Sequence, residues 1–414
     1  YQKFIEWQIT TLRDNDRIIQ GSHPVGWCPV DQNPVSQHDT MGDVEPKIND
    51  ENYLVKFKLD EYVFPITTLR PETLFGITNL WVNPNTIYKK IKADDEKWIV
   101  SQECAEKLKF FGKEITIEGD IKGTEIIGKF AKTPHTEQEI PIFEAEFVES
   151  GMGTGLVMSV PAHAPKDYQA LMDLKSKNHE LASKIEPIPI IITEGYGKIP
   201  AKDVCERLGV TDQVDEKLEE ATEELYLKEF VNGKLNEKCG DFVNEKVEFG
   251  RNKVRDWLKD KNQLESFPTL QNAPIQCRCG CECVVKVLNN QWFLNYGDEE
   301  WKKLARNCLD GMNILPNKIK TEFHDVINWL HERACARQQG LGTKLPWDND
   351  WIVESLSDSV IYMAYYTLSR FVNDGTVEAD NLTKEFFDYI FLDKGEIGAV
   401  VSSSNLSEDI INTM

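Results

Sequence analysis

The chain has 414 residues, of which 41% are hydrophobic and 28% charged, and its 69 acidic and 47 basic residues give a formal net charge of −22. This is the composition of an ordinary globular protein of two to four domains: no apolar run is long enough to span a bilayer, and ten cysteines in so long a chain do not make a disulfide framework. The acidic balance argues against a tight, free-standing RNA binder, because such binding depends on Lys and Arg that neutralise phosphates, although basic stretches such as residues 246–261 are still suited to RNA.

A helix and then a turn-rich stretch are expected first. Residues 1–20 carry apolar side chains on one helical face, at Phe4, Ile5, Ile9 and Leu12. Residues 21–34 contain five glycines and prolines and are expected to turn repeatedly. The chain begins without Met or a signal-peptide pattern and ends abruptly, so we expect an internal piece of a longer protein.

The middle of the chain is expected to be rich in strands. Alternating and β-branched residues predict strands at 53–59, 61–68, 114–118 and 155–160, in a barrel-like domain. A helix is expected at 166–177 and an acidic helix at 215–229, with its charges on a solvated face. Residues 284–293 are expected to form a strand pair.

Helices separated by short turns are expected in the last part, at 299–307, 321–339 and 357–372, with Gly340 as a helix C-cap. This alternation is typical of half of a doubly wound α/β domain. The predicted fold is therefore an α/β domain interrupted by a β-rich insertion with peripheral helices.

A first motif, Thr-Thr-Leu-Arg-Pro-Glu-Thr-Leu-Phe-Gly, covers residues 67–76. Pro71 restricts Arg70 to an extended conformation, so a strand is expected to end here and a short helix to follow. Thr68, Arg70 and Thr73 would then gather at one turn. The alternative is an ordinary capped helix start.

A second motif, Gly-Met-Gly-Thr-Gly-Leu-Val-Met-Ser-Val-Pro-Ala-His-Ala-Pro-Lys-Asp, covers residues 151–167. Its glycines allow a backbone to approach a ligand closely. The strand that follows would carry His163 and Asp167 to a loop before a helix. The alternatives are a structural role for His163 and a helix-start charge for Asp167.

Together the two motifs resemble the editing domain of class I leucyl-, isoleucyl- and valyl-tRNA synthetases. Such enzymes need a second, hydrolytic site because one methylene in an apolar pocket distinguishes amino acids by only roughly 10–200-fold. The resemblance implies that Asp167 holds the α-ammonium group of a mischarged amino acid. It also implies that Thr68 and Thr73 shape a pocket that refuses leucine, and that Arg70 supports the loop or the terminal adenosine.

The same resemblance implies an adenosine site and a hydrolytic mechanism. The substrate-binding residues would be Gly153, Thr154, Gly155, Val157 and His163. A positioned water, helped by the terminal ribose hydroxyl, would attack the ester, so no nucleophilic triad is needed.

Residues 332–347 and 351–366 resemble the second half of the Rossmann-like catalytic domain of archaeal and eukaryotic leucyl-tRNA synthetases, and residues 27–35 and 291–294 match the same family. Glu354 and Asp358 are implied contacts to the activated amino acid or adenosine, with helix-start charge as the alternative. The expected domains are the end of the first catalytic half with a connecting loop region (1–48), the editing domain (49–255), the return connection (256–298) and the second catalytic half (299–414).

The sequence has no His-x-Gly-His and no Lys-Met-Ser-Lys-Ser motif, which the family uses to bind ATP and complete the synthetic site. We therefore expect that this piece alone makes no leucyl-adenylate, and that the intact enzyme, in the cytoplasm, uses ATP and Mg with leucine, tRNA-Leu and the rest of the synthetase chain, including its anticodon-binding domain. The alternatives are an isoleucyl- or valyl-type synthetase and a stand-alone trans-editing or RNA-binding module.

Four cysteines lie within seven residues, at Cys277, Cys279, Cys281 and Cys283. A knuckle at Gly280 could gather two or three of them around a zinc ion. A second, weaker candidate is Cys28 with Asp31 and His38, which resembles zinc-bearing loops of related enzymes although Asp31 stands where a second Cys is common.

Overall fold

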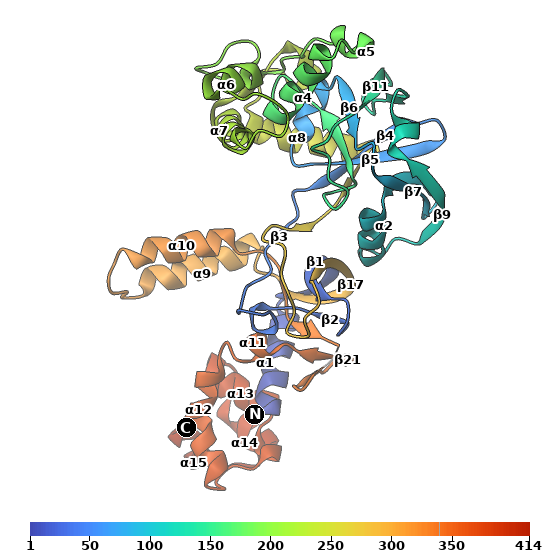
Figure 1. Ribbon diagram of the computed structural model, residues 1–414. Coiled ribbons are helices and arrows are strands. Elements are labelled where there is room, and N and C mark those ends of the chain that lie inside the picture. Colours follow the sequence, from blue (N-terminus) through green and yellow to red (C-terminus); the bar gives the residue numbers. More distant parts are fainter. Residues whose placement is uncertain (339) are drawn as a thin grey trace. The chain divides into compact units, whose positions relative to one another are not determined.

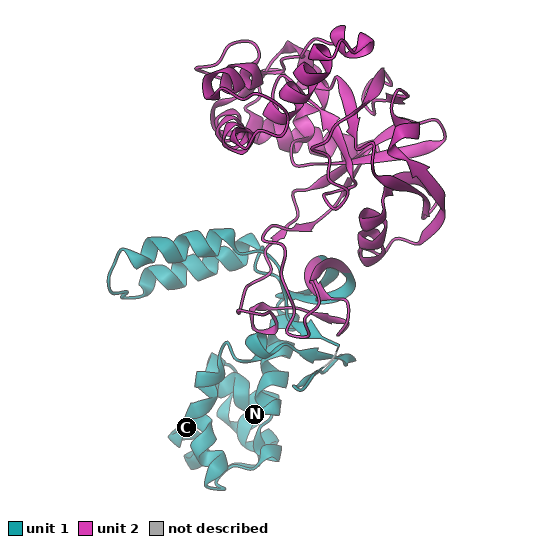
Figure 2. Ribbon diagram, in the orientation of Figure 1, with its two compact units in different colours: residues 1–23, 288–414 teal, residues 24–287 magenta. Residues whose placement is uncertain are grey.

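The computed structural model describes residues 1–338 and 340–414. It divides into two compact units, one formed by residues 1–23 with 288–414 and the other by residues 24–287 (Figure 2). None of the helices in the described residues is long and apolar enough to cross a membrane.

The 24–287 unit is built on one ten-stranded sheet of mixed direction (Figure 1). Its strands are β4 (Tyr53–Leu59), β5 (Tyr62–Thr68), β6 (Asn79–Val82), β7 (Ile87–Ala93), β8 (Glu96–Ser101), β9 (Ile115–Lys122), β10 (Phe130–Lys132), β11 (Glu139–Glu144), β12 (Leu156–Ser159) and β15 (Leu264–Ser266). The order is β12-β6-β11-β10-β4-β5-β8-β7-β9, with β15 paired to β4. The pairs β5–β8 and β6–β11 are parallel. The large sheet confirms the predicted β-rich region.

Both faces of this sheet are covered. Along β4, Val55 and Phe57 enter the main apolar cluster, while Leu54 enters a second cluster with Trp98. Successive side chains of a strand point to opposite faces. The Leu54 face of β4 also carries two lysines, of which Lys56 is buried and Lys58 is exposed. The register of β4 with β5 pairs Tyr53 with Thr68, which fixes the end of β5 where the first motif begins.

Helices lie around the sheet (Figure 1). They are α2 (Gln102–Leu108), α3 (Gly123–Ile126), α4 (Pro165–Ser176), α5 (Glu180–Ser183), α6 (Pro200–Leu208), α7 (Lys217–Asn232) and α8 (Val247–Asp260). The short strands are β2 (Asn33–Pro34), β3 (Ile48–Asn49), β13 (Ile191–Ile192), β14 (Lys234–Leu235) and β16 (Thr269–Leu270). The acidic helix is α7, and its buried stripe is Leu218, Ala221, Leu225 and Glu229. The expectation that its charges are all solvated is therefore wrong for Glu229.

The other unit is mainly helical. Its helices are α1 (Gln2–Asp14), α9 (Glu299–Gly311), α10 (Ile319–Trp329), α11 (Ser355–Asp358), α12 (Tyr362–Asn373), α13 (Lys384–Leu392), α14 (Ile397–Ser404) and α15 (Glu408–Thr413). The aromatic rings of Phe4 and Trp7 on α1 pack against Phe387 and Phe391 on α13. Short strands β18 (Arg333–Ala334), β19 (Ala336–Arg337), β20 (Lys344–Leu345) and β21 (Asp348–Val353) complete it, and β21 pairs antiparallel with β19 and β20.

Five expected elements differ from the structure. The helix expected at 357–372 is divided into α11 and α12. The helix expected at 321–339 ends at Trp329, because the residues after it pair as β18 with β17 (Val284–Leu294) and as β19 with β21. Residue 339 of the expected helix lies outside the described residues. Gly340 is therefore no helix C-cap. The first helix ends at Asp14, and the stretch expected to turn contains β1 (Ile18–Cys28). The strand pair expected at 284–293 is one long strand, β17 (Val284–Leu294).

Candidate functional site

The first motif forms the turn at the end of β5. Pro71 opens a short 3-10 helix, η2 (Pro71–Gly76), and Arg70 stands just before it. The Arg70 backbone N–H donates to Thr68 Oγ1 at 2.9 Å, and Thr73 Oγ1 donates to the Arg70 carbonyl at 2.7 Å. Both threonine hydroxyls are thus held by the backbone of one residue. Thr73 is buried and Thr68 half-buried.

The glycine-rich loop lies against this turn. Gly153 has φ +58°, and a Cβ there would come within 2.0 Å of Thr67 Oγ1. Gly155 has φ +74°, and its Cβ would come within 2.8 Å of the Ser101 Cβ. A side chain at either position would therefore push the loop away from the ends of β5 and β8.

Much of the loop backbone already has partners. The Gly155 carbonyl accepts from the Tyr88 hydroxyl at 2.9 Å, and the Thr154 carbonyl accepts from the Ser101 N–H at 2.9 Å. Val157 is a member of β12 and pairs with Trp81 of β6. The Thr154 hydroxyl is buried and has no hydrogen-bond partner among the described residues. Of the adenosine-site residues expected from sequence, Thr154 thus has a side-chain polar atom left for a ligand or a water.

Asp167 lies in the first turn of α4, where the helix dipole favours a negative charge. Its side chain is 5% exposed. Oδ2 accepts from the Val160 N–H at 2.8 Å, and Oδ1 accepts from the Trp81 indole N–H at 3.0 Å. Burial raises the pKa of Asp167 to about 7, against the lowering effect of these two hydrogen bonds.

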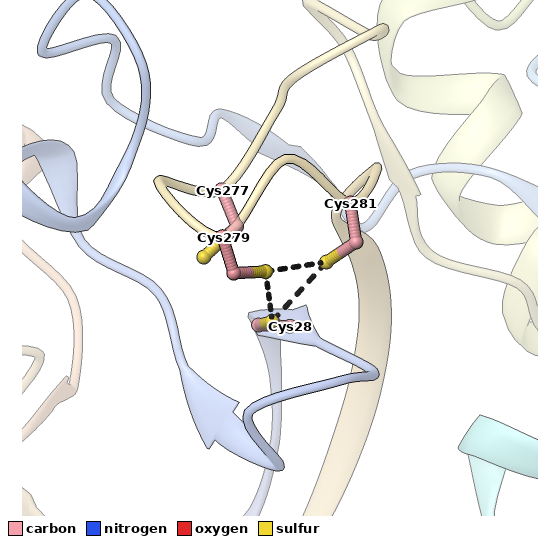
Figure 3. A group of neighbouring side chains, drawn as sticks. All are labelled: Cys28, Cys277, Cys279 and Cys281. Atoms are coloured by element: carbon pink, nitrogen blue, oxygen red, sulfur yellow. Dashed lines mark hydrogen bonds between the residues drawn. The ribbon is translucent and has the colours of Figure 1, made fainter.

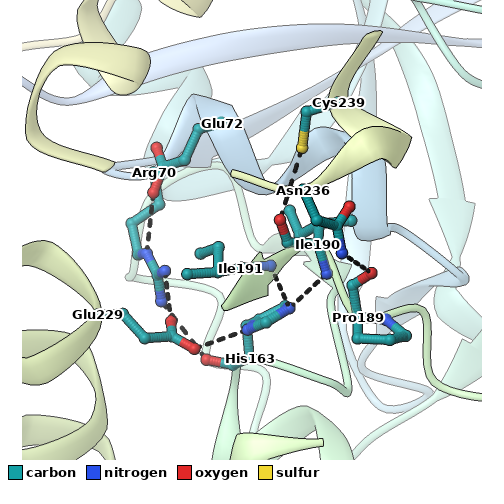
Figure 4. A network of polar contacts seen from close by, with 9 residues as sticks. All are labelled: Arg70, Glu72, His163, Pro189, Ile190, Ile191, Glu229, Asn236 and Cys239. Atoms are coloured by element: carbon teal, nitrogen blue, oxygen red, sulfur yellow. Dashed lines mark hydrogen bonds and ion pairs between the residues drawn. The ribbon is translucent and has the colours of Figure 1, made fainter. Parts of the chain in front are cut away.

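His163 is fully buried within a polar network (Figure 4). Its Nε2 accepts from the Ile190 N–H at 2.8 Å, so Nδ1 carries the ring proton and donates it to Glu229 Oε1 at 2.6 Å. Both ring nitrogens are used within the protein, so the ring supports this network. The expected substrate-binding role of His163 stays a prediction.

Glu229 of α7 joins this network to the first motif. Its Oε2 accepts from Arg70 Nη2 at 2.7 Å, and Arg70 Nε donates to Glu72 at 3.2 Å (Figure 4). Burial alone would raise the pKa of Glu229, but Arg70, followed by His163, outweighs it and the pKa is lowered. Sequence reasoning missed Glu229. The available signal was its place on the apolar stripe of α7.

The two motifs are brought together in one region of the 24–287 unit. Arg70 Nη1 donates to the His163 carbonyl at 3.4 Å, and the Tyr226 ring lies 4.4 Å from the Arg70 guanidinium carbon. Burial raises the pKa of Tyr226 to about 12; the nearby Asp167 carboxylate adds to the rise, while Arg70 opposes it. Tyr226 therefore lies near both Arg70 and Asp167.

A second candidate site is a group of four thiols, Cys28, Cys277, Cys279 and Cys281, whose Sγ atoms all lie within 4.8 Å of one another (Figure 3). Cys28 Sγ is 3.5 Å from Cys279 and 3.2 Å from Cys281. A tetrahedral zinc with Zn–S bonds of about 2.3 Å holds its sulfurs about 3.8 Å apart. The donor set thus fits zinc in type, number and spacing.

The thiols that lie together differ from the four expected from the sequence. Cys283 is not a member of this group, although it is buried in one apolar cluster with Cys28 and Cys277. Cys28 takes its place. Asp31 lies beside the group and accepts from Cys28 and Cys277 at 3.3 Å each. His38 is exposed, pairs weakly with Asp43 at 3.9 Å and does not belong to the group.

The remaining expected residues lie in the other unit. Glu354 caps α11, where its side chain accepts from the Leu356 and Ser357 N–H groups at 3.0 and 3.1 Å. Asp358 ends the same helix, and burial, with Glu354 nearby, raises its pKa. The capping role expected as an alternative is thus present for Glu354.

Comparisons with known proteins match one part of the chain to a family model and the whole chain to curated relatives. Residues 50–185 match the family model described as leucyl-tRNA synthetase, editing domain. The whole chain is 46% identical over 437 residues to a leucine–tRNA ligase of Methanococcus maripaludis, and 43% identical over 429 residues to that of Methanocaldococcus jannaschii. The chain spans 45% of the length of each of these two relatives.

A solved structure is similar to part of the chain. The P. knowlesi cytosolic leucyl-tRNA synthetase editing domain is 17% identical, with a TM-score of 0.49, and the match covers 54% of this chain and 98% of that one.

Proposed function

Since the chain belongs to the leucyl-tRNA synthetase family, we propose that its 24–287 unit hydrolyses mischarged tRNA-Leu. One observation carries the proposal. Asp167 is a buried carboxylate with uncharged hydrogen-bond donors, and it lies in the same region as the turn that carries Thr68, Arg70 and Thr73, called the threonine-bearing turn below. Such a group can gain a cation as its partner, and an aminoacyl ester brings an α-ammonium group.

Each group then has a task. Asp167 holds the ammonium; each of its oxygens already accepts one hydrogen bond and has a second lone pair free for another. Thr68 and Thr73 form the wall that refuses leucine, and Thr154, with the backbone of Gly153, Gly155 and Val157, faces the terminal adenosine.

The reaction is ester hydrolysis. The oxygen of a water adds to the ester carbonyl, the bond to the ribose oxygen breaks, and that oxygen takes up the proton lost by the water. The products are the free amino acid and tRNA. Alignment of the water by the terminal ribose hydroxyl supplies the proximity that lowers the barrier.

The rest of the chain fits a leucine–tRNA ligase. The match to leucine–tRNA ligases covers both units, which favours this family over an isoleucyl- or valyl-type enzyme or a stand-alone trans-editing module. We propose that residues 1–48 and 299–414 are parts of the interrupted Rossmann-like catalytic domain, that residues 49–255 form the editing domain and that residues 256–298 are the return connection. Glu354 and Asp358 would lie near activated leucine, in a cytoplasmic enzyme that uses ATP and Mg.

We also propose that Cys28, Cys277, Cys279 and Cys281 bind zinc. The spacing of their thiols supports it, and the metal would join two segments that lie about 250 residues apart in sequence. Metal analysis of the purified chain should give one zinc per chain, and Cys28→Ser should lose it while Cys283→Ser keeps it. Equal retention in both variants would exclude the site.

The editing proposal is tested by hydrolysis of isoleucyl- and leucyl-tRNA-Leu. The native chain should cleave the isoleucyl ester faster, and Asp167→Ala should lose this activity. Glu223→Gln, which changes an exposed acid of α7, is the matched control. Unchanged hydrolysis by Asp167→Ala would remove Asp167 from the site.

A further inference from the structure

Two side chains of α7 converge on one residue of the threonine-bearing turn. Tyr226 and Glu229 are three positions apart and share a face of the helix. The Tyr226 ring covers the Arg70 guanidinium, and the Glu229 carboxylate accepts from its Nη2 at 2.7 Å. Arg70 and Glu229 are 159 positions apart in sequence, so their contact is a feature of the tertiary fold.

Arg70 passes this constraint to both threonines. Its N–H holds the Thr68 hydroxyl, and its carbonyl accepts from the Thr73 hydroxyl. A rotation of the Arg70 backbone would therefore move both hydroxyls together. The Arg70 side chain is 14% exposed, and its guanidinium is the part that α7 anchors.

The other oxygen of the same carboxylate reaches the opposite motif. Glu229 Oε1 accepts from His163 Nδ1 at 2.6 Å, and His163 stands four residues before Asp167 (Figure 4). One fully buried carboxylate thus holds the threonine-bearing turn with one oxygen and the segment that leads to Asp167 with the other. Glu219, Glu220 and Glu223 on the same helix are exposed.

We propose that Glu229 is a positioning residue of the editing site, which sets the discrimination against leucine by fixing the threonine-bearing turn relative to the Asp167 segment. The proposal rests on the proposed editing function. Glu229 touches neither substrate nor water; it acts through Arg70 and His163. A misplacement of about 1 Å at a reacting site can cost roughly a hundredfold in rate, so a displaced turn should alter which ester is accepted.

The test is the ratio of kcat/KM for isoleucyl- against leucyl-tRNA-Leu, measured on the full chain. Glu229→Gln keeps the shape of the side chain, but its amide NH2 opposes a donor from either Arg70 or His163. The ratio should fall about tenfold to a hundredfold. The ratio should fall less in Glu229→Asp, which keeps the charge. In Glu223→Gln it should equal the ratio of the native chain. Partial unfolding lowers both rates by one factor and leaves the ratio unchanged.

The outcomes separate the two proposals. If the native chain hydrolyses neither ester, the editing function fails and Glu229 loses its role with it. If the native chain discriminates and folded Glu229→Gln keeps the native ratio, Glu229 serves stability alone and this inference is overturned. If Glu229→Gln does not fold, Tyr226→Leu decides by the same criterion, because it frees the other face of the Arg70 guanidinium.

Discussion

Two buried carboxylates in the 24–287 unit are held in opposite ways. Glu229 faces the guanidinium of Arg70 and the imidazole of His163. The hydrogen-bond donors that the described residues give to Asp167, the Val160 N–H and the Trp81 indole, are uncharged. Burial acts in the same direction on both acids. The pKa is lowered at Glu229, where the Arg70 guanidinium, followed by the contact with His163, outweighs burial, and raised to about 7 at Asp167.

This difference separates a group that holds a site from one that binds a ligand. A buried carboxylate with a cation beside it has its charge already compensated, and its removal leaves that cation unpaired. A buried carboxylate with neutral donors is destabilised when ionised, so an ammonium group that reaches it relieves this cost. Asp167 is accordingly the better candidate to meet substrate, and Glu229 the better candidate for support.

The largest effect is expected when the supporting carboxylate, Glu229, is removed. Glu229→Ala leaves the Arg70 guanidinium buried without its main partner, and should lower the free energy of unfolding by about 3–5 kcal/mol. Glu223→Ala, on the exposed face of α7, should change it by less than about 0.5 kcal/mol. Urea denaturation of both variants measures this. A loss below 1 kcal/mol for Glu229→Ala would show that the pair contributes little, and the contrast with Asp167 would then disappear.

A smaller effect concerns how stability depends on pH. The contributions of the two carboxylates to the free energy of unfolding should change in opposite directions as pH rises. The ordinary pKa of Asp167 is 3.8 and its folded pKa is about 7, so its contribution to stability is complete below 3.8 and is lost as pH rises to 7. Between pH 5 and 7 the native chain should therefore lose about 1.4 kcal/mol per pH unit relative to Asp167→Asn, and no more above 7. Glu229 has a lowered pKa, so its contribution is lost only below its ordinary value of 4.5. Parallel curves for the two chains would contradict the raised pKa.

The sequence predicted the strands and helices around the site better than the side-chain contacts that hold the site in place. The strand at 53–59 and the helix near 166–177 were found from periodicity, because a buried face leaves a local pattern. The two motifs also lie together, as expected from their joint resemblance. The helix expected to run to residue 339 ends at Trp329, since the residues that follow pair with β17 and β21 and this pairing outweighs helix propensity.

Partners distant in sequence explain what was missed. Glu229 stands among acids that face solvent, and only its place in the stripe with Leu218, Ala221 and Leu225 marks it as buried. Its partner Arg70 is 159 residues away. In the same way, Cys28 replaces Cys283 in the thiol group because the fold, and not the spacing near Gly280, decides which thiols meet.

A third prediction tests whether Asp167 binds the ammonium group of the substrate. If the carboxylate form receives the ammonium group, kcat/KM for isoleucyl-tRNA-Leu should rise with pH to a plateau above about 7. At pH 6 it should be about tenfold lower, because about one molecule in ten is then ionised. Rates with Asp167→Ala, measured at the same pH values, correct for spontaneous ester hydrolysis. A flat profile would mean that Asp167 is already ionised or takes no part.

The smallest expected effect tests how Asp167 is tuned. Trp81→Phe keeps an aromatic ring in the core but removes the indole N–H that donates to Asp167 Oδ1 at 3.0 Å. Because that bond favours the ionised form, its loss should move the midpoint of the pH profile upward by about one unit. Trp98→Phe is the matched control, since Trp98 is equally buried but donates to Glu96. If both variants keep the native midpoint, the indole does not set the charge of Asp167; if both shift it alike, the cause is general loosening of the core. A shift in Trp81→Phe alone would show that the neutral indole donor helps to set the charge of this carboxylate before substrate binds.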